Sequence, residues 1–426
     1  MLKGKALFLL VFLAFGSFLS QAQTGSINQI QHIIFMVQEN RSTDSYFGEL
    51  GRYRSQHGFT SNFDGVPSST TSTYDLSGRL IQPYHYQTAC TNNLSPAWNE
   101  SHYDIHLVNG VYKMDRFMKT TGSVPQGVDT TGTRAMGHYD DTDLPYYYDL
   151  ATSFGTSDRF FSPVLSNTNV NRMYLFAATS FGHIFPDPPP SGGWTQPTIF
   201  DKLTAAKISW RYYYIDNSVY LASWATWHKG GSAHVFPISQ YYQDIQNPST
   251  LAHVIFIERA AVTGLDEHPL NNVQKGAANT KKIIDALLGS PSWATSAFIL
   301  TYDEGGGLYD HVPPQPRVKP DSIPPMLRSG DLPGDFNQTG FRVPIIVLSP
   351  WSKPHFVSHT VRDYTSILKF IETRFGLTPL TARDAAADNM TGFFDFTNAF
   401  YLRPPVIVPQ PTNKICNFNY EKAPGS

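Results

Sequence analysis

Two apolar segments, far apart in the sequence, each end in acidic or amide side chains, and this pairing constrains the fold most. Residues 32–37 and 297–300 have the length and composition of buried strands. The polar residues that follow them are Glu39, Asn40, Asp303 and Glu304. Three glycines come directly after the second pair, and glycine lets a backbone approach a ligand closely. Because open α/β sheets bind ligands beyond the carboxyl ends of their strands, we expect these four side chains to meet at one site.

Three carboxylates and an amide that converge would repel one another unless a cation lay between them. We therefore predict that Glu39, Asn40, Asp303 and Glu304 bind one divalent metal ion. All-oxygen ligation favours Mg²⁺, Ca²⁺ or Mn²⁺, and Zn²⁺ is also compatible. The alternative is that Asn40 or Ser42 caps a following helix, with Glu39 at an exposed edge.

Further strand candidates alternate with helical stretches along the chain. The strand candidates are residues 253–257 and 343–348, and the helical stretches are residues 277–288 and 365–374. Such alternation predicts an α/β three-layer sandwich, with a mostly parallel central sheet and helices on both faces. We expect residues 53–132 to form long loops over the sheet edge, and residues 217–248 to be an insertion that helps to cover the site.

The composition is that of a lightly charged globular protein. Of 426 residues, 41% are hydrophobic and 15% are charged, and the formal net charge is −2. Lys and Arg are not clustered in the sequence, so we expect no nucleic-acid partner.

The N-terminus has the pattern of an export signal. Lys3 and Lys5 precede an apolar run over residues 6–19, and Ala22 ends a small-residue cleavage site. An uncleaved anchor is the alternative, but a bilayer span takes about 20 apolar residues. We predict a cleaved signal peptide over residues 1–22 and a secreted or periplasmic protein without stable membrane insertion. Residues 23–400 would form the α/β domain, and residues 401–426 an extended C-terminal tail.

The chain has two cysteines, Cys90 and Cys416. In an exported protein an even pair predicts one disulfide, here between the C-terminal tail and an early loop. Free buried thiols are the alternative. Two cysteines so far apart, without neighbouring histidines, do not predict a zinc site.

Several short motifs, in colinear order, resemble the bacterial phosphoesterase family. They are residues 38–48, 113–115, 136–140, 158–161, 171–175, 266–269, 303–304, 343–351 and 358–372. That family includes non-haemolytic phospholipases C and certain acid phosphatases, within the alkaline-phosphatase-like superfamily. The resemblance implies a hydrolase that acts on a phosphate ester, either a phospholipid or a small monoester.

The same resemblance places the family's catalytic hydroxyl on Thr168. The family's Gly-Pro-Thr-x-Pro-Asn-Arg motif reads Ser-Asn-Thr-Asn-Val-Asn-Arg over residues 166–172, so two prolines and a glycine are replaced. Ser166 is the alternative nucleophile, and Thr168 could instead simply cap a helix. G-x-S-x-G, H-E-x-x-H and P-loop motifs are absent from the sequence. A metal-activated Thr168 would attack phosphorus and form a phospho-threonine intermediate that water then hydrolyses.

Histidines and an arginine complete the predicted site. A leaving alcohol needs a proton, and histidine is the usual donor near neutral pH. By resemblance, His268 and His106 are catalytic. The substrate-binding candidates are Arg172, Asn171, His311 and His359. Arg172 could instead pair with a local carboxylate.

Together these features predict an exported, metal-dependent phosphoric ester hydrolase of the phospholipase C or acid phosphatase type. The hypothesis from another class is a catalytically inactive extracellular binding protein on the same fold. The sequence argues against this hypothesis, because it contains both the predicted metal ligands and the predicted nucleophile, and a binding protein has no need for an activated hydroxyl. These residues are Glu39, Asn40, Thr168, Asp303 and Glu304.

Overall fold

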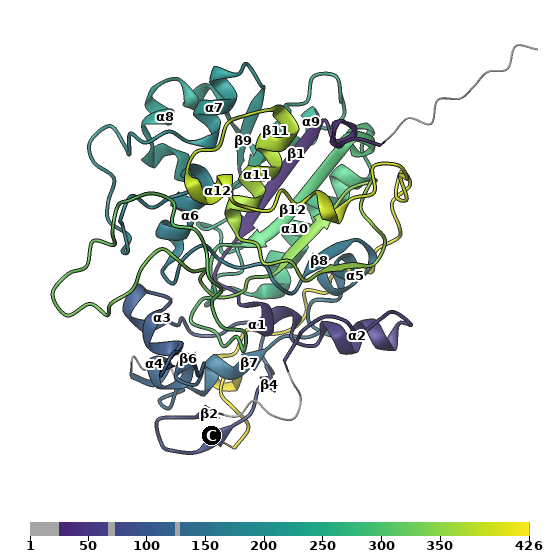
Figure 1. Cartoon of the computed structure of the whole chain (residues 1–426). Coiled ribbons are helices and arrows are strands. Elements are labelled where there is room, and N and C mark those ends of the chain that lie inside the picture. The colour runs from purple at the N-terminus through teal and green to yellow at the C-terminus, as the bar shows by residue number, and fades with distance from the viewer. Residues whose placement is uncertain (1–24, 67–72, 124–127, 426) are drawn as a thin grey trace, which may run out of the picture.

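The computed structural model describes residues 25–66, 73–123 and 128–425. The predicted signal peptide lies outside the described residues. The chain is built around one eight-stranded sheet (Figure 1). In spatial order its strands are β10 (Val235–Pro237), β9 (Trp210–Tyr214), β11 (Val254–Ile257), β1 (His32–Gln38), β12 (Ser296–Tyr302), β13 (Ile345–Leu348), β8 (Gly155–Ser157) and β14 (Phe356–Ser358).

The sheet is mostly parallel, as predicted. β13 is antiparallel to both of its neighbours, β12 and β8, and every other strand pair is parallel. β1 lies between β11 and β12, and all residues of these three strands are buried. Such continuous apolar strands are expected where helices cover both faces of a sheet.

The long helices form layers on the two faces of the sheet. On one side α6 (Thr168–Ala177) packs against α7 (Ile199–Ala205) and α11 (Tyr364–Phe375), and on the other α5 (Pro145–Ser153) packs against α10 (Val273–Leu288). In Figure 1, α11 crosses in front of the sheet and α10 lies behind it. The predicted α/β three-layer sandwich is confirmed.

The sequence of α10 explains its position. Val273, Ala277, Ile284 and Leu287 recur at helical spacing and are buried. Asn272 caps the helix by accepting a hydrogen bond from the Lys275 N–H.

The expectation of long loops over residues 53–132 is wrong in part. Hydrophobic residues there, such as Trp98 and Phe117, lie in short helices and are buried in small satellite cores. The shorter helices of the chain are α1 (Thr43–Phe47), α2 (Leu50–Gln56), α3 (Trp98–Asp104), α4 (Phe117–Ser123), α8 (Ala225–His228), α9 (Ile238–Asp244) and α12 (Ala382–Ala385). The two-stranded pairs are β2 (Thr73–Tyr74) with β3 (Leu80–Ile81), β4 (Tyr84–His85) with β7 (Gly137–His138), and β5 (Leu107–Val108) with β6 (Val111–Tyr112).

Residues 217–248 extend the sheet, and none of them lines the Thr168 pocket described below. They contribute the edge strand β10 and the helices α8 and α9. The Tyr220 hydroxyl also donates to the Asn169 carbonyl at 2.9 Å, which ties this segment to the start of α6.

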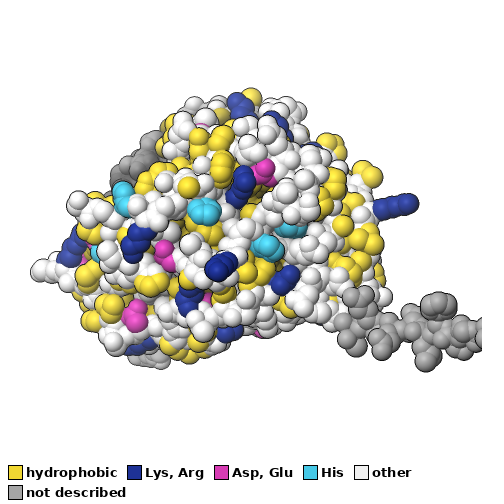
Figure 2. All heavy atoms as spheres, turned by 90° about the horizontal axis from the view of Figure 1, so that it is seen from above, with side chains coloured by type: hydrophobic (Ala, Val, Ile, Leu, Met, Phe, Trp, Pro, Cys, Tyr) yellow, Lys and Arg dark blue, Asp and Glu magenta, His cyan; other side chains and the backbone are white. Residues whose placement is uncertain are grey.

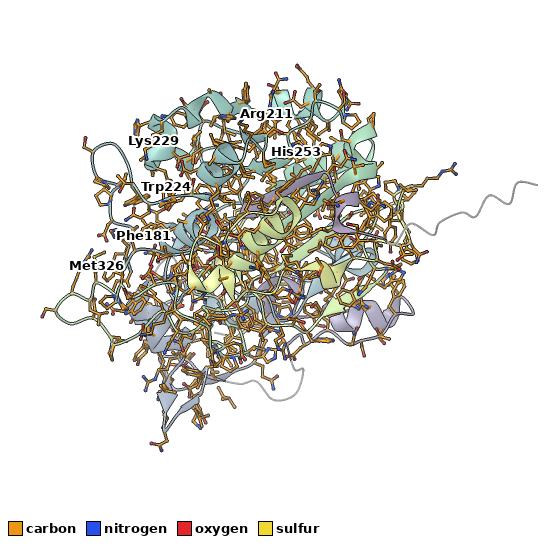
Figure 3. All side chains as sticks on the ribbon, turned by 45° about the horizontal axis from the view of Figure 1, so that its top comes forward. Phe181, Arg211, Trp224, Lys229, His253 and Met326 are labelled. Atoms are coloured by element: carbon orange, nitrogen blue, oxygen red, sulfur yellow. A yellow bond between two sulfur atoms is a disulfide. The ribbon has the colours of Figure 1, made fainter. Side chains whose placement is uncertain are left out.

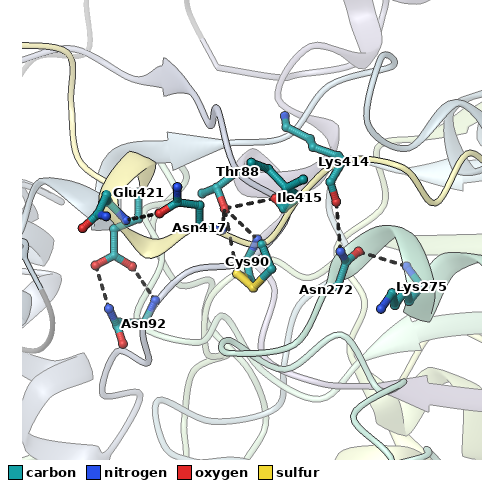
Figure 4. Close-up of a disulfide and its surroundings, with 11 residues drawn as sticks. Thr88, Cys90, Asn92, Asn272, Lys275, Lys414, Ile415, Asn417 and Glu421 are labelled. Carbon is teal, nitrogen blue, oxygen red and sulfur yellow. Dashed lines mark hydrogen bonds between the residues drawn. A yellow bond between two sulfur atoms is a disulfide. The ribbon is translucent and has the colours of Figure 1, made fainter.

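A disulfide joins Cys90 to Cys416, so the predicted bridge is confirmed (Figure 4). Backbone hydrogen bonds reinforce it: Ala89 N–H donates to Ile415, and Val273 N–H donates to Ala89. The C-terminal tail is thereby held against the loop around Cys90, which in turn contacts the start of α10.

Charge is dispersed over the molecular face shown in Figure 2, where basic, acidic and histidine side chains lie singly among apolar and neutral atoms. In the described part of the chain, no helix combines the length and apolar character that a bilayer crossing requires.

Candidate functional site

The carboxyl ends of β1, β12 and β11 bring the site together. β1 leads into Glu39 and Asn40, β12 leads into Asp303, and β11 leads into Glu258 and Arg259. The Asn40 N–H donates to Asp303 Oδ1 at 2.8 Å, so the first two strand ends are in direct contact. This is the juxtaposition that the two apolar segments predict.

Thr168 reaches the same place from α6. It is the first residue of that helix, and its hydroxyl donates to Glu39 Oε2 at 3.2 Å. The hydroxyl also lies 3.4 Å from Asn40 Oδ1. The N-terminus of a helix carries a partial positive charge that favours anions, so the Thr168 hydroxyl lies in a field suited to a phosphate.

A pocket of about 470 Å³ opens above this hydroxyl. Its lining residues are Glu39, Asn167, Thr168, Asn169, Pro186, Arg259, Ala261, Asp266, His268 and Asn271. Of the predicted site residues, Glu39, Thr168 and His268 therefore share one pocket.

Asp303 and Glu304 lie behind this pocket with oxygens that lack hydrogen-bond partners. Asp303 Oδ1 accepts from the Asn40 and Glu304 N–H groups, whereas Asp303 Oδ2 and Glu304 Oε1 are buried without a hydrogen bond. Arg172 Nε lies 3.9 Å from Asp303 Oδ2, which is beyond hydrogen-bond distance. Burial, and then the charge of Glu39, raises the pKa of Asp303 well above its ordinary value. Burial and the charge of Asp303 do the same to the pKa of Glu304. Unpartnered buried carboxylate oxygens fit the requirements of a hard cation.

Two arginines hold Glu39 in its charged form. Arg172 Nη2 and Arg259 Nε each lie 2.9 Å from Glu39 Oε1. Burial alone would raise the pKa of Glu39, but Arg259 and Arg172 together lower it below its ordinary value. Arg172 also pairs with Glu258 at 2.9 Å and is completely buried. It therefore lies beneath the carboxylates and does not line the pocket, which matches the alternative of a local ion pair.

Among the described residues, two groups of three acidic or histidine side chains have ligand atoms that all lie within 4.8 Å of one another, and neither group includes Glu39, Asp303 or Glu304. They are Asp44, Asp310 and His311, and His85, Asp140 and Asp143. Both contain a side-chain cation, as the Thr168 site does: Arg342 pairs with Asp44 at 2.7 Å, and Lys414 pairs with Asp143. The orphaned oxygens of Asp303 and Glu304 distinguish the Thr168 site from these two groups.

His268 faces the pocket in a defined tautomer. Its Nδ1 lies 2.7 Å from the Pro269 carbonyl, which can only accept, so Nδ1 carries a proton and Nε2 is left for proton exchange. The backbone N–H of His268 donates to Asp266 Oδ1, which also accepts from Asn271 Nδ2 at 2.8 Å. These contacts orient the ring from the loop that follows β11.

The structure places His106 and Asn171 elsewhere. His106 lines a separate pocket of about 590 Å³, and its Nδ1 lies 2.6 Å from Asp115 Oδ1. Asn171 is buried in α6, where its amide donates to the Ser166 carbonyl at 2.7 Å and its Oδ1 accepts from the Val164 N–H. Asn171 thus holds the shape of the loop before Thr168. The Ser166 hydroxyl is turned to the Ile184 carbonyl at 2.7 Å.

His311 and His359 belong to a neighbouring network of ion pairs. His311 contacts Asp44 at 2.7 Å and Asp64 at 3.2 Å. His359 contacts Asp158 at 2.9 Å. Neither histidine lines the Thr168 pocket.

Sequence reasoning missed Arg259. It lines the pocket, contacts Glu39, and follows the strand candidate at residues 253–257 just as Glu39 follows the first strand. The position of a residue after a strand was therefore a signal that could have identified it.

Comparison with known proteins finds matches over most of the chain. A model of the phosphoesterase family matches residues 30–378. The hemolytic phospholipase C of Pseudomonas aeruginosa is 30% identical over 443 residues, which cover 88% of this chain and 57% of that protein. Phospholipase C B of Mycobacterium tuberculosis is 30% identical over 427 residues, which cover 87% of this chain and 79% of that protein.

Among solved structures, a protein of the alkaline phosphatase superfamily from Vibrio parahaemolyticus aligns with 84% of this chain and 69% of its own, with a TM-score of 0.42 and 10% identity. The family model covers most of the present chain and includes Glu39, Thr168, His268 and Asp303. The chain belongs to the phosphoesterase family.

Proposed function

We propose that this protein is an exported, metal-dependent phosphoric ester hydrolase of the phospholipase C type, with Thr168 as its nucleophile. One observation carries the proposal: the Thr168 hydroxyl, at the start of α6, donates to Glu39 at 3.2 Å in a pocket that also contains Arg259 and His268. A hydroxyl, a cationic group and a proton donor around one space are what phosphoryl transfer requires.

In the first step the Thr168 hydroxyl passes its proton to Glu39 Oε2, the Thr168 oxygen attacks phosphorus, and the bond from phosphorus to the alcohol oxygen breaks. Arg259 neutralises the phosphate oxygens, and His268 Nε2 gives a proton to the leaving alcohol. In the second step water attacks the phosphorus of phosphorylated Thr168 and gives a proton to His268. The bond from phosphorus to the threonine oxygen breaks, the phosphoryl product leaves, and the proton held by Glu39 returns to re-form the threonine hydroxyl. The same histidine thus acts as acid and then as base.

A divalent cation held by Glu39, Asn40, Asp303 and Glu304 would supply Lewis-acid stabilisation of the alkoxide. The buried oxygens of Asp303 and Glu304 without donors support this assignment. Arg172 would remain beneath the site and balance the charge of Glu39 and Glu258.

The named relatives favour a phosphodiester of a lipid over a monoester. Two proteins with about 30% identity are phospholipases C, so the leaving alcohol here would be a diacylglycerol. Export is supported by the Cys90–Cys416 disulfide, because such bonds persist in oxidising compartments.

The experiment is a hydrolysis screen of the purified protein with phosphatidylcholine, sphingomyelin and p-nitrophenyl phosphate, with and without a chelator. The proposal expects chelator-sensitive release of the phosphorylated head group from a phospholipid. Turnover of the monoester alone would make the protein an acid phosphatase. No turnover of any substrate with added metal would favour the inactive binding protein.

A further inference from the structure

Three large apolar side chains project from one loop near the pocket. Ile323, Met326 and Leu327 are 43%, 46% and 45% exposed, although they lie within five residues of one another. Figure 3 shows Met326 at the outer edge of the molecule, below Phe181. Single exposed apolar residues are common on protein surfaces, but a cluster of them marks an interaction site.

In this loop, residues 323–327, every backbone N–H group has a hydrogen-bond partner within the protein. Ile323 N–H donates to Asp321 Oδ1 at 2.8 Å, and Met326 N–H donates to the Gly182 carbonyl at 2.8 Å. Leu327 N–H donates to the Pro325 carbonyl, and prolines at 324 and 325 have no N–H. A segment whose N–H groups are all paired within the protein can enter an apolar medium without the cost of unpaired donors.

The loop rests on the segment that forms one wall of the Thr168 pocket. Met326 bonds to Gly182, and the Arg328 guanidinium lies 4.0 Å from the centre of the Phe185 ring and 2.7 Å from Asp187. Pro186, between these two contact residues, lines the pocket.

A second wall of the pocket also carries an exposed apolar residue. Val262 is 75% exposed and follows Ala261, which lines the pocket. Exposed apolar side chains therefore lie on two separate segments beside the pocket: residues 323–327, which rest on residues 182–187, and residue 262.

We propose that the loop over residues 323–327 docks on the surface of a phosphatidylcholine bilayer and brings the Thr168 pocket to its lipid substrate. This inference rests on the proposed function, since a lipid phosphodiester is met at a bilayer surface. Ile323, Met326 and Leu327 would lie among the upper acyl chains. Arg328, whose side chain is 59% exposed, would remain at the depth of the lipid phosphates.

The test compares the full-length mature protein with the double variant Met326→Ser/Leu327→Ser. Flotation with phosphatidylcholine vesicles in the presence of a chelator measures binding without turnover. Hydrolysis is then measured with metal on the same vesicles and on soluble p-nitrophenyl phosphorylcholine. The double variant should bind vesicles about tenfold more weakly or worse and lose vesicle hydrolysis by a similar factor. It should hydrolyse the soluble ester at the wild-type rate, because neither residue lines the pocket.

The matched control is Leu402→Ser/Val406→Ser, which removes two apolar side chains that are 56% and 98% exposed in the C-terminal tail. It should bind vesicles like the wild type. Equal binding by wild type and the Met326/Leu327 variant would overturn the proposal, as would a wild type that binds no vesicles. The proposal would also be overturned if the wild type formed a dimer and bound no vesicles, and the Met326/Leu327 variant was a monomer. The loop would then be an interface between two copies of the chain. Vesicle binding that depends on Met326 and Leu327, without hydrolysis of either substrate, would uphold the docking surface and refute the proposed function.

Discussion

Arg259 Nε lies 2.9 Å from Glu39 Oε1, the oxygen that Arg172 also contacts, and Glu39 Oε2 is the oxygen that accepts from Thr168. The two oxygens of one carboxylate thus have separate partners. Glu39 therefore connects the two arginines to the hydroxyl that we propose as nucleophile. Arg259 differs from Arg172 because it also reaches the pocket.

Arg259→Ala should weaken substrate binding and phosphorylation together. We expect kcat/KM to fall by about 10²-fold, since hydrogen bonds to charged groups contribute roughly 1.5–3 kcal/mol each. Competitive inhibition by inorganic phosphate should weaken as well. Arg259→Lys should recover only part of the loss, because it keeps the charge without the bidentate geometry.

The control for this variant is Arg211→Ala. Arg211, on β9, pairs with Asp244 at 2.8 Å and is labelled in Figure 3. It does not line the pocket. If Arg259→Ala binds inorganic phosphate as tightly as Arg211→Ala does, Arg259 is not part of the substrate site.

Asp303→Asn should release the metal and abolish turnover while the fold persists. The amide keeps the shape of the side chain but is a much weaker ligand for a divalent cation than a carboxylate. Because a ligand that binds only the native state stabilises it, a chelator should lower the melting temperature of the wild type and leave that of Asp303→Asn nearly unchanged. Metal analysis by mass spectrometry and thermal unfolding check both outcomes.

Glu39→Ala should behave in the same way, and Asp244→Asn serves as a carboxylate control outside the site. Unchanged metal stoichiometry in both Asp303→Asn and Glu39→Ala would show that the cation is bound elsewhere.

The strands that position the site could be predicted from the sequence, since β1, β11, β12 and β13 are continuous apolar runs. Their polar ends could be predicted as one site because parallel strands share a carboxyl edge. β8 and β14 could not be found in this way. Residues 155–157 read Gly-Thr-Ser, and their strand conformation depends on pairing with β13 and β14.

Side-chain partners were less accessible to sequence reasoning than strand ends. Arg172 and Asn171 occur in a recognisable motif, but only the packing of α6 shows that both are buried beneath the pocket. His106 lies next to the short hairpin of β5 and β6, and the position of that region depends on long-range contacts of Trp98 and Phe117. Sequence spacing carries no information about such contacts.

His311 should make the folded protein more stable at neutral pH than at high pH. Burial would lower its pKa, but hydrogen bonds to Asp44 and Asp64 raise the pKa to about 10. A raised pKa means that the stabilisation is complete below the pKa of the unfolded chain, about 6.5, and is lost as the pH rises towards 10. His311→Gln should cost roughly 1–3 kcal/mol of unfolding free energy at pH 7 and much less at pH 10.

Urea unfolding at several pH values measures this effect. His359→Gln is the matched control, because the His359 side chain is 55% exposed beside Asp158. A stability difference between wild type and His311→Gln that does not change with pH would contradict the assignment.

The Cys90–Cys416 bridge should stabilise the fold without acting in catalysis. Cys416→Ser should lower the unfolding free energy by roughly 2–4 kcal/mol, and reductant should have no further effect on this variant. Activity well below the melting temperature should persist, since neither cysteine lines the pocket. Thiol titration of denatured, unreduced protein should find no free thiol, and two titratable thiols would refute the bridge.

The most direct test of the account is to trap the intermediate on Thr168. After rapid acid quenching with ³²P-labelled substrate, peptide mapping should find the labelled phosphoryl group on the peptide that contains Thr168. Thr168→Ser keeps the hydroxyl and should retain the label and substantial turnover. Thr168→Ala should lose both, with a fall in rate beyond the roughly 10²–10⁴-fold typical of a lost general acid or base, yet still bind metal. Turnover by Thr168→Ala at a near-wild-type rate, or label on a peptide without Thr168, would contradict the account.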